Sequence, residues 1–185
     1  MPFIFLFFLL FLFICSMVNI PLGGKKLIYF EKKSFLGLFK TPMVRVEGVF
    51  INLGGAIIPI VFSLYLFFLI WRKGFDLEPV LLSVFLLILV CKFLSKVVPG
   101  KGIVISPFIP PIFSVLLALA LTPEYAASCA FISGVWGTLI GGDILNLGRV
   151  RKVSPGMISI GGAGVFDGIF LVGIISFLLV LFVSF

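Results

Sequence analysis

Long apolar runs are the feature that most limits what this chain can fold into. Crossing the hydrocarbon core of a bilayer takes about 20 consecutive apolar residues in helical form. Six segments approach or exceed that length, roughly 3–22, 49–71, 79–98, 106–122, 125–147 and 157–185. Because 62% of the 185 residues are hydrophobic and only 11% are charged, too little polar surface remains for a soluble domain. We therefore expect an all-α membrane protein, with residues 1–185 forming a compact bundle of about six transmembrane helices.

The runs indicate helices rather than the strands of a membrane barrel. They lack the alternation of apolar and polar residues that a barrel strand shows, and a helix pairs its backbone groups internally. The first run has no basic residue before it and no clear cleavage site after it. We interpret it as a retained span rather than a signal peptide.

Basic residues are concentrated in alternate loops. Those that follow the first, third and fifth runs or lie at their ends are Lys25, Lys26, Lys32, Lys33, Lys40, Arg45, Lys92, Lys96, Lys101, Arg149, Arg151 and Lys152. The remaining two, Arg72 and Lys73, stand near Asp76 and Glu78. Because short cytoplasmic loops hold the excess of Lys and Arg, we expect both termini outside. Topology and contact with anionic lipid also account for the net charge of +7, so we expect membrane lipid as a partner and no nucleic acid.

The segment 23–48 combines basic and aromatic residues between the first two runs. We interpret it as a cytoplasmic interfacial segment that lies among lipid headgroups. The alternation in "MVRVEGV" and the content of "LIYF" also permit a short strand pair. An exposed edge of that pair would align an extended substrate by strand addition.

Asp143 and Asp167 are the acidic residues placed inside the runs. A charge at bilayer depth is costly, so such a residue is a functional candidate. Asp143 lies six residues before Arg149, which puts it about 9 Å below the basic loop at 1.5 Å per residue. Glycines and a proline between Lys152 and Asp167 delay the start of the last helix, so we expect a similar depth for Asp167.

Other polar and helix-disrupting residues fall at the same depth. Asn146 lies one helical turn from Asp143, and Asn52 lies a similar distance into the second run. We expect both asparagines to orient the aspartates. Pro110 and Pro111 open the fourth run from the same side, and we expect them to contribute to binding.

Glycines surround Asp167. Small residues let membrane helices approach closely, so we expect Gly161, Gly162 and Gly164 to admit a substrate or a partner helix. The motif "INLGGA" at 51–56 returns as "ISIGGA" at 158–163. This match is compatible with a shared packing motif and with an internal repeat.

Two interpretations of the aspartates follow from their position. Each can be a neutral, hydrogen-bonded packing residue. If they face each other in low dielectric, they cannot both ionise readily and will share one proton. The ionised partner then activates a water while the protonated one polarises a carbonyl, as in aspartic proteases.

The chain resembles a family of bacterial and archaeal multi-pass membrane proteins, domain of unknown function 1614. The residues that carry this resemblance are above all "GTLIGGDILNLGRVRK" and "SIGGAGVFDGIFLVGI". It implies an integral protein of the cytoplasmic (inner) membrane of a bacterium or archaeon.

A more distant likeness concerns "GVFDGIF" at 164–170, which is similar to the second catalytic motif of presenilin and signal peptide peptidase. The preceding run, ending near an aspartate, resembles their first motif. This likeness implies an intramembrane aspartyl protease with Asp143 and Asp167 as its catalytic dyad. The chain has Phe166 where that motif has its second glycine, and Gly142 where a tyrosine usually precedes the first aspartate.

Several other chemistries are disfavoured by the composition. No histidine occurs, which excludes histidine-dependent nucleophilic catalysis and histidine-bound zinc within this chain. Mg²⁺ between Asp143, Asn146 and Asp167 would have a thin ligand set, so we expect no metal and no cofactor. Three cysteines in separate runs lack paired spacing and are interpreted as packing residues: Cys15, Cys91 and Cys129.

Three functions therefore stay open. The leading hypothesis is an aspartyl protease-like hydrolase that acts near the cytoplasmic side on a transmembrane peptide. The alternative is a proton- or cation-coupled transporter or channel that uses the same carboxylates. A non-catalytic membrane assembly subunit would tolerate Asn in place of both aspartates.

Overall fold

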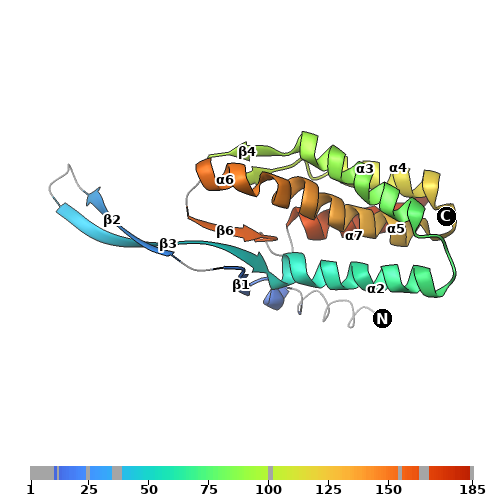
Figure 1. Cartoon of the computed structure of the whole chain (residues 1–185), viewed down its shortest axis with the longest axis horizontal. Helices are drawn as coiled ribbons and strands as arrows, with labels where there is room; N and C mark the ends of the chain where they lie inside the picture. Colours follow the sequence, from blue (N-terminus) through green and yellow to red (C-terminus); the bar gives the residue numbers. More distant parts are fainter. Residues whose placement is uncertain are drawn as a thin grey trace.

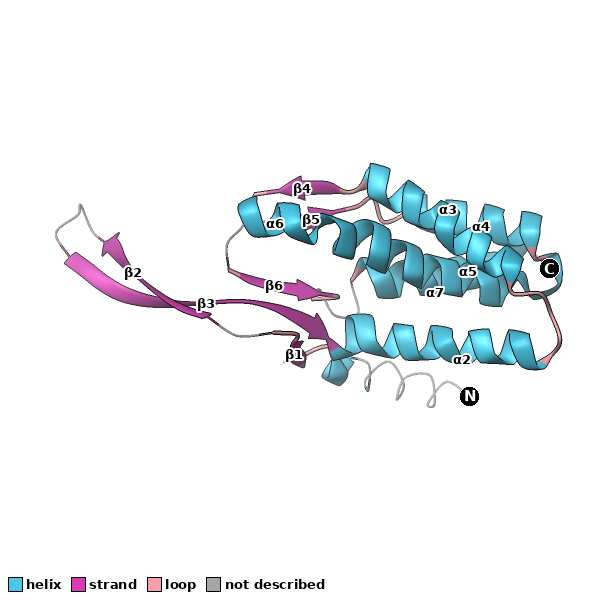
Figure 2. Cartoon of the chain, in the orientation of Figure 1, coloured by secondary structure: helices cyan, strands magenta, loops and turns pink. Residues whose placement is uncertain are grey.

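The computed structural model describes residues 11, 13–23, 26–34, 39–99, 102–153, 156–162 and 167–183. Within these residues the chain is mostly helical, as expected, and it also contains strands gathered at one end of the helices (Figures 1 and 2). The expectation that the apolar runs are helical throughout was therefore wrong in one respect, because some of these strands lie within the runs.

From residue 53 onward the described chain forms five helical stretches. Their parts are η1 Leu53–Ile57, α2 Ile58–Arg72, α3 Glu78–Leu94, α4 Ile109–Leu121, η2 Pro123–Tyr125, α5 Ala126–Trp136, η3 Gly137–Asp143, η4 Ile144–Asn146, α6 Leu147–Val153 and α7 Gly168–Val183. The segments η1 and η3 are π-helical, whereas η2 and η4 are 3₁₀ turns. The stretch from η2 to α6 is continuous, so α5 leads directly through η3 into the basic end of the molecule.

Two sets of strands are described. The first contains β1 Asn19–Pro21, β2 Lys26–Ser34, β3 Phe39–Asn52 and β6 Met157–Ile160, and the second pairs β4 Lys96–Val98 with β5 Gly102–Val104. Strand β3 pairs antiparallel with β2 over its first part. Its last residues pair antiparallel with β1 and parallel with β6, where Ile51 lies opposite Ile160. The β2–β3 ribbon extends well beyond the helices (Figure 1).

The two ends of the helical bundle differ in charge. Strands β4 and β6 and helix α6 lie at one end, whereas the α2–α3 connection lies at the other with the C-terminal end of α7 (Figure 1). Lys96 and Arg149 belong to the first end, and Arg72 and Lys73 belong to the second. The loops assigned to the cytoplasm from their basic residues thus share one end of the molecule.

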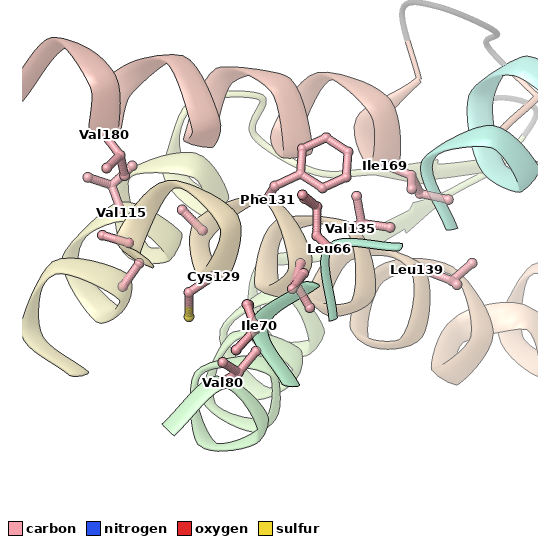
Figure 3. Close-up of a cluster of buried hydrophobic side chains, with 14 of the residues drawn as sticks. Leu66, Ile70, Val80, Val115, Cys129, Phe131, Val135, Leu139, Ile169 and Val180 are labelled. Atoms are coloured by element: carbon pink, nitrogen blue, oxygen red, sulfur yellow. The ribbon is translucent and has the colours of Figure 1, made fainter. Parts of the chain in front are cut away.

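Helix α5 forms the centre of the bundle and contacts α2, α3, α4 and α7. Side chains from these helices converge around it in Figure 3, with Phe131 and Val135 of α5 near Leu66 of α2. Close packing depends on small residues, because a Cβ on Gly173 of α7 would lie 2.8 Å from Cγ2 of Val135. Filling that space would force side chains or backbone to shift.

Strands replace the expected helix at one end of four of the six apolar runs: residues 19–21, 49–52, 96–98 and 157–160. These segments are short and apolar and contain β-branched residues, so hydropathy alone does not separate them from helix ends. Most of the first expected span, 3–22, lies outside the described residues.

Two helices in the described part of the chain are long and apolar enough to cross a membrane, by length and composition. They span Leu53–Arg72 and Pro123–Val153. Two shorter apolar helices, Ile109–Leu121 and Gly168–Val183, accompany them.

Candidate functional site

Asp143 is the last residue of η3, where the chain leaves the regular helix α5. π-helical turns are rare and are frequent at functional sites. Two glycines precede Asp143, and Gly141 is required there because its neighbour is backbone. A Cβ on Gly141 would collide with the carbonyl oxygen of Ile88 in α3, and one on Gly142 would lie 2.6 Å from Cδ1 of Ile105. Small residues therefore let η3 pack closely here, which fixes the position of the partly buried Asp143.

Asn146 stabilises this distorted helix from its C-terminal side. It is fully buried, and its side-chain amide donates to the carbonyl oxygens of Gly142 at 2.7 Å and Gly141 at 3.2 Å. The same amide donates to Oγ of Ser95 at 2.6 Å. These bonds connect η3 to the end of α3. Asn146 therefore affects the position of Asp143 indirectly, by binding the backbone of the two glycines that precede Asp143.

Lys92 completes the connection between α3 and η4. Its Nζ donates to Oδ1 of Asn146 at 2.8 Å and to the carbonyl oxygen of Leu145 at 2.7 Å. The side-chain oxygen of Asn146 thus accepts an ammonium group. This arrangement disfavours the magnesium alternative, which needed that oxygen as a ligand for a cation.

Asp167 immediately precedes α7 and caps its N-terminus. Its Oδ1 accepts a hydrogen bond from the backbone N–H of Ile169 at 2.9 Å, and its carbonyl accepts one from Leu171 at 2.9 Å. Aspartate is among the preferred residues at this position. The positive end of the helix dipole favours a negative charge on it.

The two aspartates interact although 24 positions separate them in the chain. The charge of Asp167 acts on the carboxyl group of Asp143, and the backbone N–H of Gly161 lies near enough to favour the charged form of that same group. Three segments therefore meet here: the end of η3, the turn after β6 and the start of α7.

Gly161 is held in a conformation that favours glycine, with φ at +68°. A Cβ at this position would lie 2.7 Å from Cβ of Ala56 and 2.8 Å from the carbonyl carbon of Gly55. The turn continues at Gly162, whose N–H donates to the carbonyl of Ser159 at 3.2 Å. Gly161 thus packs closely against η1 and also lies near Asp143. Gly164 lies outside the described residues.

Asn52 lies on the opposite side of this turn and is fully buried. It caps η1, because its Oδ1 accepts from the N–H of Gly55 at 2.8 Å. Its amide donates to the carbonyl of Ser16 and to Oδ1 of Asn19, and the latter oxygen also accepts from Oγ of Ser159 at 2.5 Å. Asn52 therefore connects β1, β3 and β6, and reaches the aspartates only through the sheet.

The motifs "INLGGA" and "ISIGGA" lie side by side in this arrangement. Their first residues belong to β3 and β6, which run parallel, and each strand leads toward a helix in the same direction (Figure 1). Asn52 and Ser159 occupy the same motif position, and both bind Asn19. The structural likeness of the two motifs thus extends to a shared hydrogen-bond partner.

Pro110 and Pro111 are buried in the first turn of α4. Proline suits this position because the first N–H groups of a helix have no partner within it. The segment before α4 reaches the site through Ile105, which packs against Gly142. The prolines thus begin the helix that follows this contact.

A groove of about 640 Å³, lined mostly by apolar residues, lies between the β3–β6 ladder and α6, with Ile144, the residue after Asp143, in its wall. Ile144, which follows Asp143, lines it together with Ile160, which precedes Gly161. The full lining is Leu22, Gly23, Glu47, Gly48, Val49, Ile144, Leu147, Arg151, Gly156, Ile158 and Ile160. The volume falls within the range of ligand sites in proteins.

Four residues of this site were missed by a search for acids in apolar runs: Asn19, Lys92, Ser95 and Ser159. Lys92 was interpreted only as a marker of topology. Ser159 had a usable signal, since it matches Asn52 in the repeated motif. Within the described residues, no group of three or more His, Cys, Asp or Glu side chains is placed to hold a metal ion.

Comparison with known proteins gives one match. The model of a family described as "Protein of unknown function (DUF1614)" matches residues 13–179. Searches of curated proteins and of solved structures find no match to this chain.

Proposed function

The chain belongs to this family, and because the family's description names no activity, we propose a function from the site itself. In this proposal the chain is an integral membrane hydrolase of the aspartyl protease type, with Asp143 and Asp167 as its carboxylate pair. The observation that carries the proposal is the interaction of the two carboxylates at the end of η3 and the start of α7.

The membrane location is supported by the distribution of side chains. Six phenylalanines on outer helix surfaces are 42% to 85% exposed: Phe62, Phe68, Phe85, Phe93, Phe113 and Phe182. Hydroxyl side chains are instead buried between helices: Ser63, Ser83, Ser114, Thr122, Ser133, Thr138 and Ser176. A surface of this kind suits lipid. The proposed location is the inner membrane of a bacterium or archaeon, with the strand end of the bundle in the cytoplasm.

The two carboxylates have different surroundings, which suggests their roles. The first turn of α7 favours a negative charge on Asp167. Burial of the Asp143 carboxyl group and the charge of Asp167 beside it both disfavour a second negative charge and outweigh the N–H of Gly161, which favours the ionised form, so the shared proton belongs on Asp143. Asp167 then takes a proton from the attacking water, while Asp143 donates a hydrogen bond to the carbonyl of the scissile peptide.

The apolar groove supports a peptide as the substrate. Its walls are mostly aliphatic, with Glu47 and Arg151 among them, and they include Ile144 and Ile160, the chain neighbours of Asp143 and Gly161. A transmembrane peptide that unwinds near the cytoplasmic surface would bring an extended segment with apolar side chains to this place. Water reaching the same end would supply the nucleophile.

A photoaffinity probe tests this proposal without knowledge of the natural substrate. The probe is an apolar peptide analogue with a hydroxyethylene group in place of the scissile bond and a benzophenone for crosslinking. Its hydroxyl-bearing carbon imitates the tetrahedral intermediate, and such analogues bind more tightly than substrates. We expect the wild-type chain in liposomes to be labelled and both Asp143→Asn and Asp167→Asn to lose labelling.

The matched control is Asp76→Asn, which changes an exposed acid at the opposite end of the bundle. It is expected to keep full labelling. Labelling that survives in either site variant would contradict the proposal. Proton uptake by the same liposomes, dependent on both aspartates in a protein that the probe does not label, would favour the transporter instead.

A further inference from the structure

A second groove lies on the outer surface of the bundle, between α3 and α4. It has a volume of about 460 Å³ and is lined by five residues of α3 between Leu86 and Leu94, with Phe113 and Leu117 of α4. All of these residues are apolar. The groove is separate from the aspartates, whose own groove lies between the β3–β6 ladder and α6.

The charges around this groove are asymmetric along its length. Helix α3 begins with Glu78 at one end of the bundle, and its last turn is followed by the exposed Lys96 at the other. No acidic residue occurs anywhere from Pro79 to Thr122. Lys92 is engaged with Asn146, whereas Lys96 is exposed and follows Leu94, the last groove residue of α3, by two positions in the chain.

We propose that this groove binds an anionic phospholipid, with one acyl chain along α3 and α4 and the headgroup phosphate at Lys96. An apolar trough that ends beside an uncompensated cation matches the polarity of such a lipid, and basic sites of this kind at the cytoplasmic side recognise anionic headgroups. The proposal rests on the proposed membrane location and is independent of the hydrolase activity.

Native mass spectrometry of the delipidated full chain tests this site. The protein is offered phosphatidylglycerol and phosphatidylcholine with identical acyl chains in equal amounts. One lysine near the surface favours the anionic lipid by about fivefold, so we expect that preference in the wild type. We expect Lys96→Gln to abolish it, whereas Lys73→Gln, which removes an exposed lysine at the opposite end, should retain it.

The acyl-chain part is tested by Phe93→Ala, which removes a wall of the groove. Phe85→Ala is its control, since Phe85 lies on the same helix and is also exposed, but does not line the groove. We expect Phe93→Ala to lose bound lipid of both kinds and Phe85→Ala to keep it. Equal unfolding temperatures of the two variants establish that both are folded.

The proposal would be overturned by a preference for the anionic lipid that survives Lys96→Gln, or by equal lipid retention in the two phenylalanine variants. Glycerol phosphate in excess distinguishes a lipid site from a simple phosphate site. It should not displace the lipid, and displacement by the headgroup alone would also refute the proposed site. Loss of peptide hydrolysis in the aspartate variants has no bearing on any of these outcomes.

Discussion

The backbone N–H of Gly161 lies near enough to the carboxyl group of Asp143 to favour its charged form, although Gly161 follows β6 and Asp143 ends η3. The parallel pairing of β6 with β3 sets where Gly161 lies. The strands at the basic end thus belong to the candidate site, because they carry a donor to one of its two carboxylates.

Gly161→Ala should destabilise the chain strongly. The substitution places a Cβ at a positive φ and against Gly55 and Ala56, which together cost about 2–4 kcal/mol. Gly74→Ala is the control, because Gly74 also has a positive φ but meets nothing within 4 Å, so it should cost about 1 kcal/mol. A thiol-reactive dye that labels the buried cysteines on unfolding measures both. Equal losses of stability would contradict the close packing of Gly161.

Gly141→Ala should separate α3 from η3. The added methyl group meets the carbonyl of Ile88, which is backbone and cannot rotate away, so the cost is about 1–3 kcal/mol. Gly148→Ala in α6 meets nothing within 4 Å and should be neutral or stabilise by up to about 1 kcal/mol. Thermal unfolding compares the two, and a neutral Gly141→Ala would refute the packing of η3 on α3.

Lys92→Met should destabilise the end of α3 and the start of η4. It removes the donor to Asn146 and to the carbonyl of Leu145, and a buried polar group left without its partner costs about 1–3 kcal/mol. Lys96→Met, at an exposed position of β4, should change stability much less. Chemical denaturation in mild detergent distinguishes the two. A Lys92→Met variant as stable as Lys96→Met would mean that the bonds to Asn146 contribute nothing.

Two substitutions of Asp167 separate its capping role from its charge. Asparagine is also a favoured N-cap, so Asp167→Asn should keep near-normal stability, whereas Asp167→Ala should lose about 1 kcal/mol. Both should abolish hydrolysis in the proposed mechanism, because neither accepts a proton from water. Unfolding temperature and probe labelling are measured on the same preparations. A stable Asp167→Ala variant would show that Asp167 does not cap α7.

Helices were the predictable part of this fold. The apolar runs predicted the approximate positions of the described helices because uninterrupted hydropathy over many residues has few structural outcomes. Strands such as β6 were missed, since "MISI" is as apolar as the helix that follows it. Only the pairing with β3, which depends on residues more than a hundred positions earlier, decides its conformation.

The candidate site was partly predictable as well. Asp143 and Asp167 were identifiable because an acid in an apolar run is unusual. Asn146 was expected to orient the aspartates, but its hydrogen bond with Lys92 was not predicted, because the two residues are 54 positions apart in the chain. Long-range partners of this kind follow from the packing of α3 on η3. They cannot be predicted from the spacing of residues in a single sequence.

Cleavage of a membrane-embedded peptide tests the central claim most directly. Liposomes would carry the purified chain and a library of apolar single-span peptides, with products identified by mass spectrometry. We expect cleavage near the cytoplasmic end by the wild type and by Asp76→Asn, and a loss of at least about 100-fold in both Asp143→Asn and Asp167→Asn. Cleavage that continues in either of these two variants would contradict a catalytic pair formed by Asp143 and Asp167.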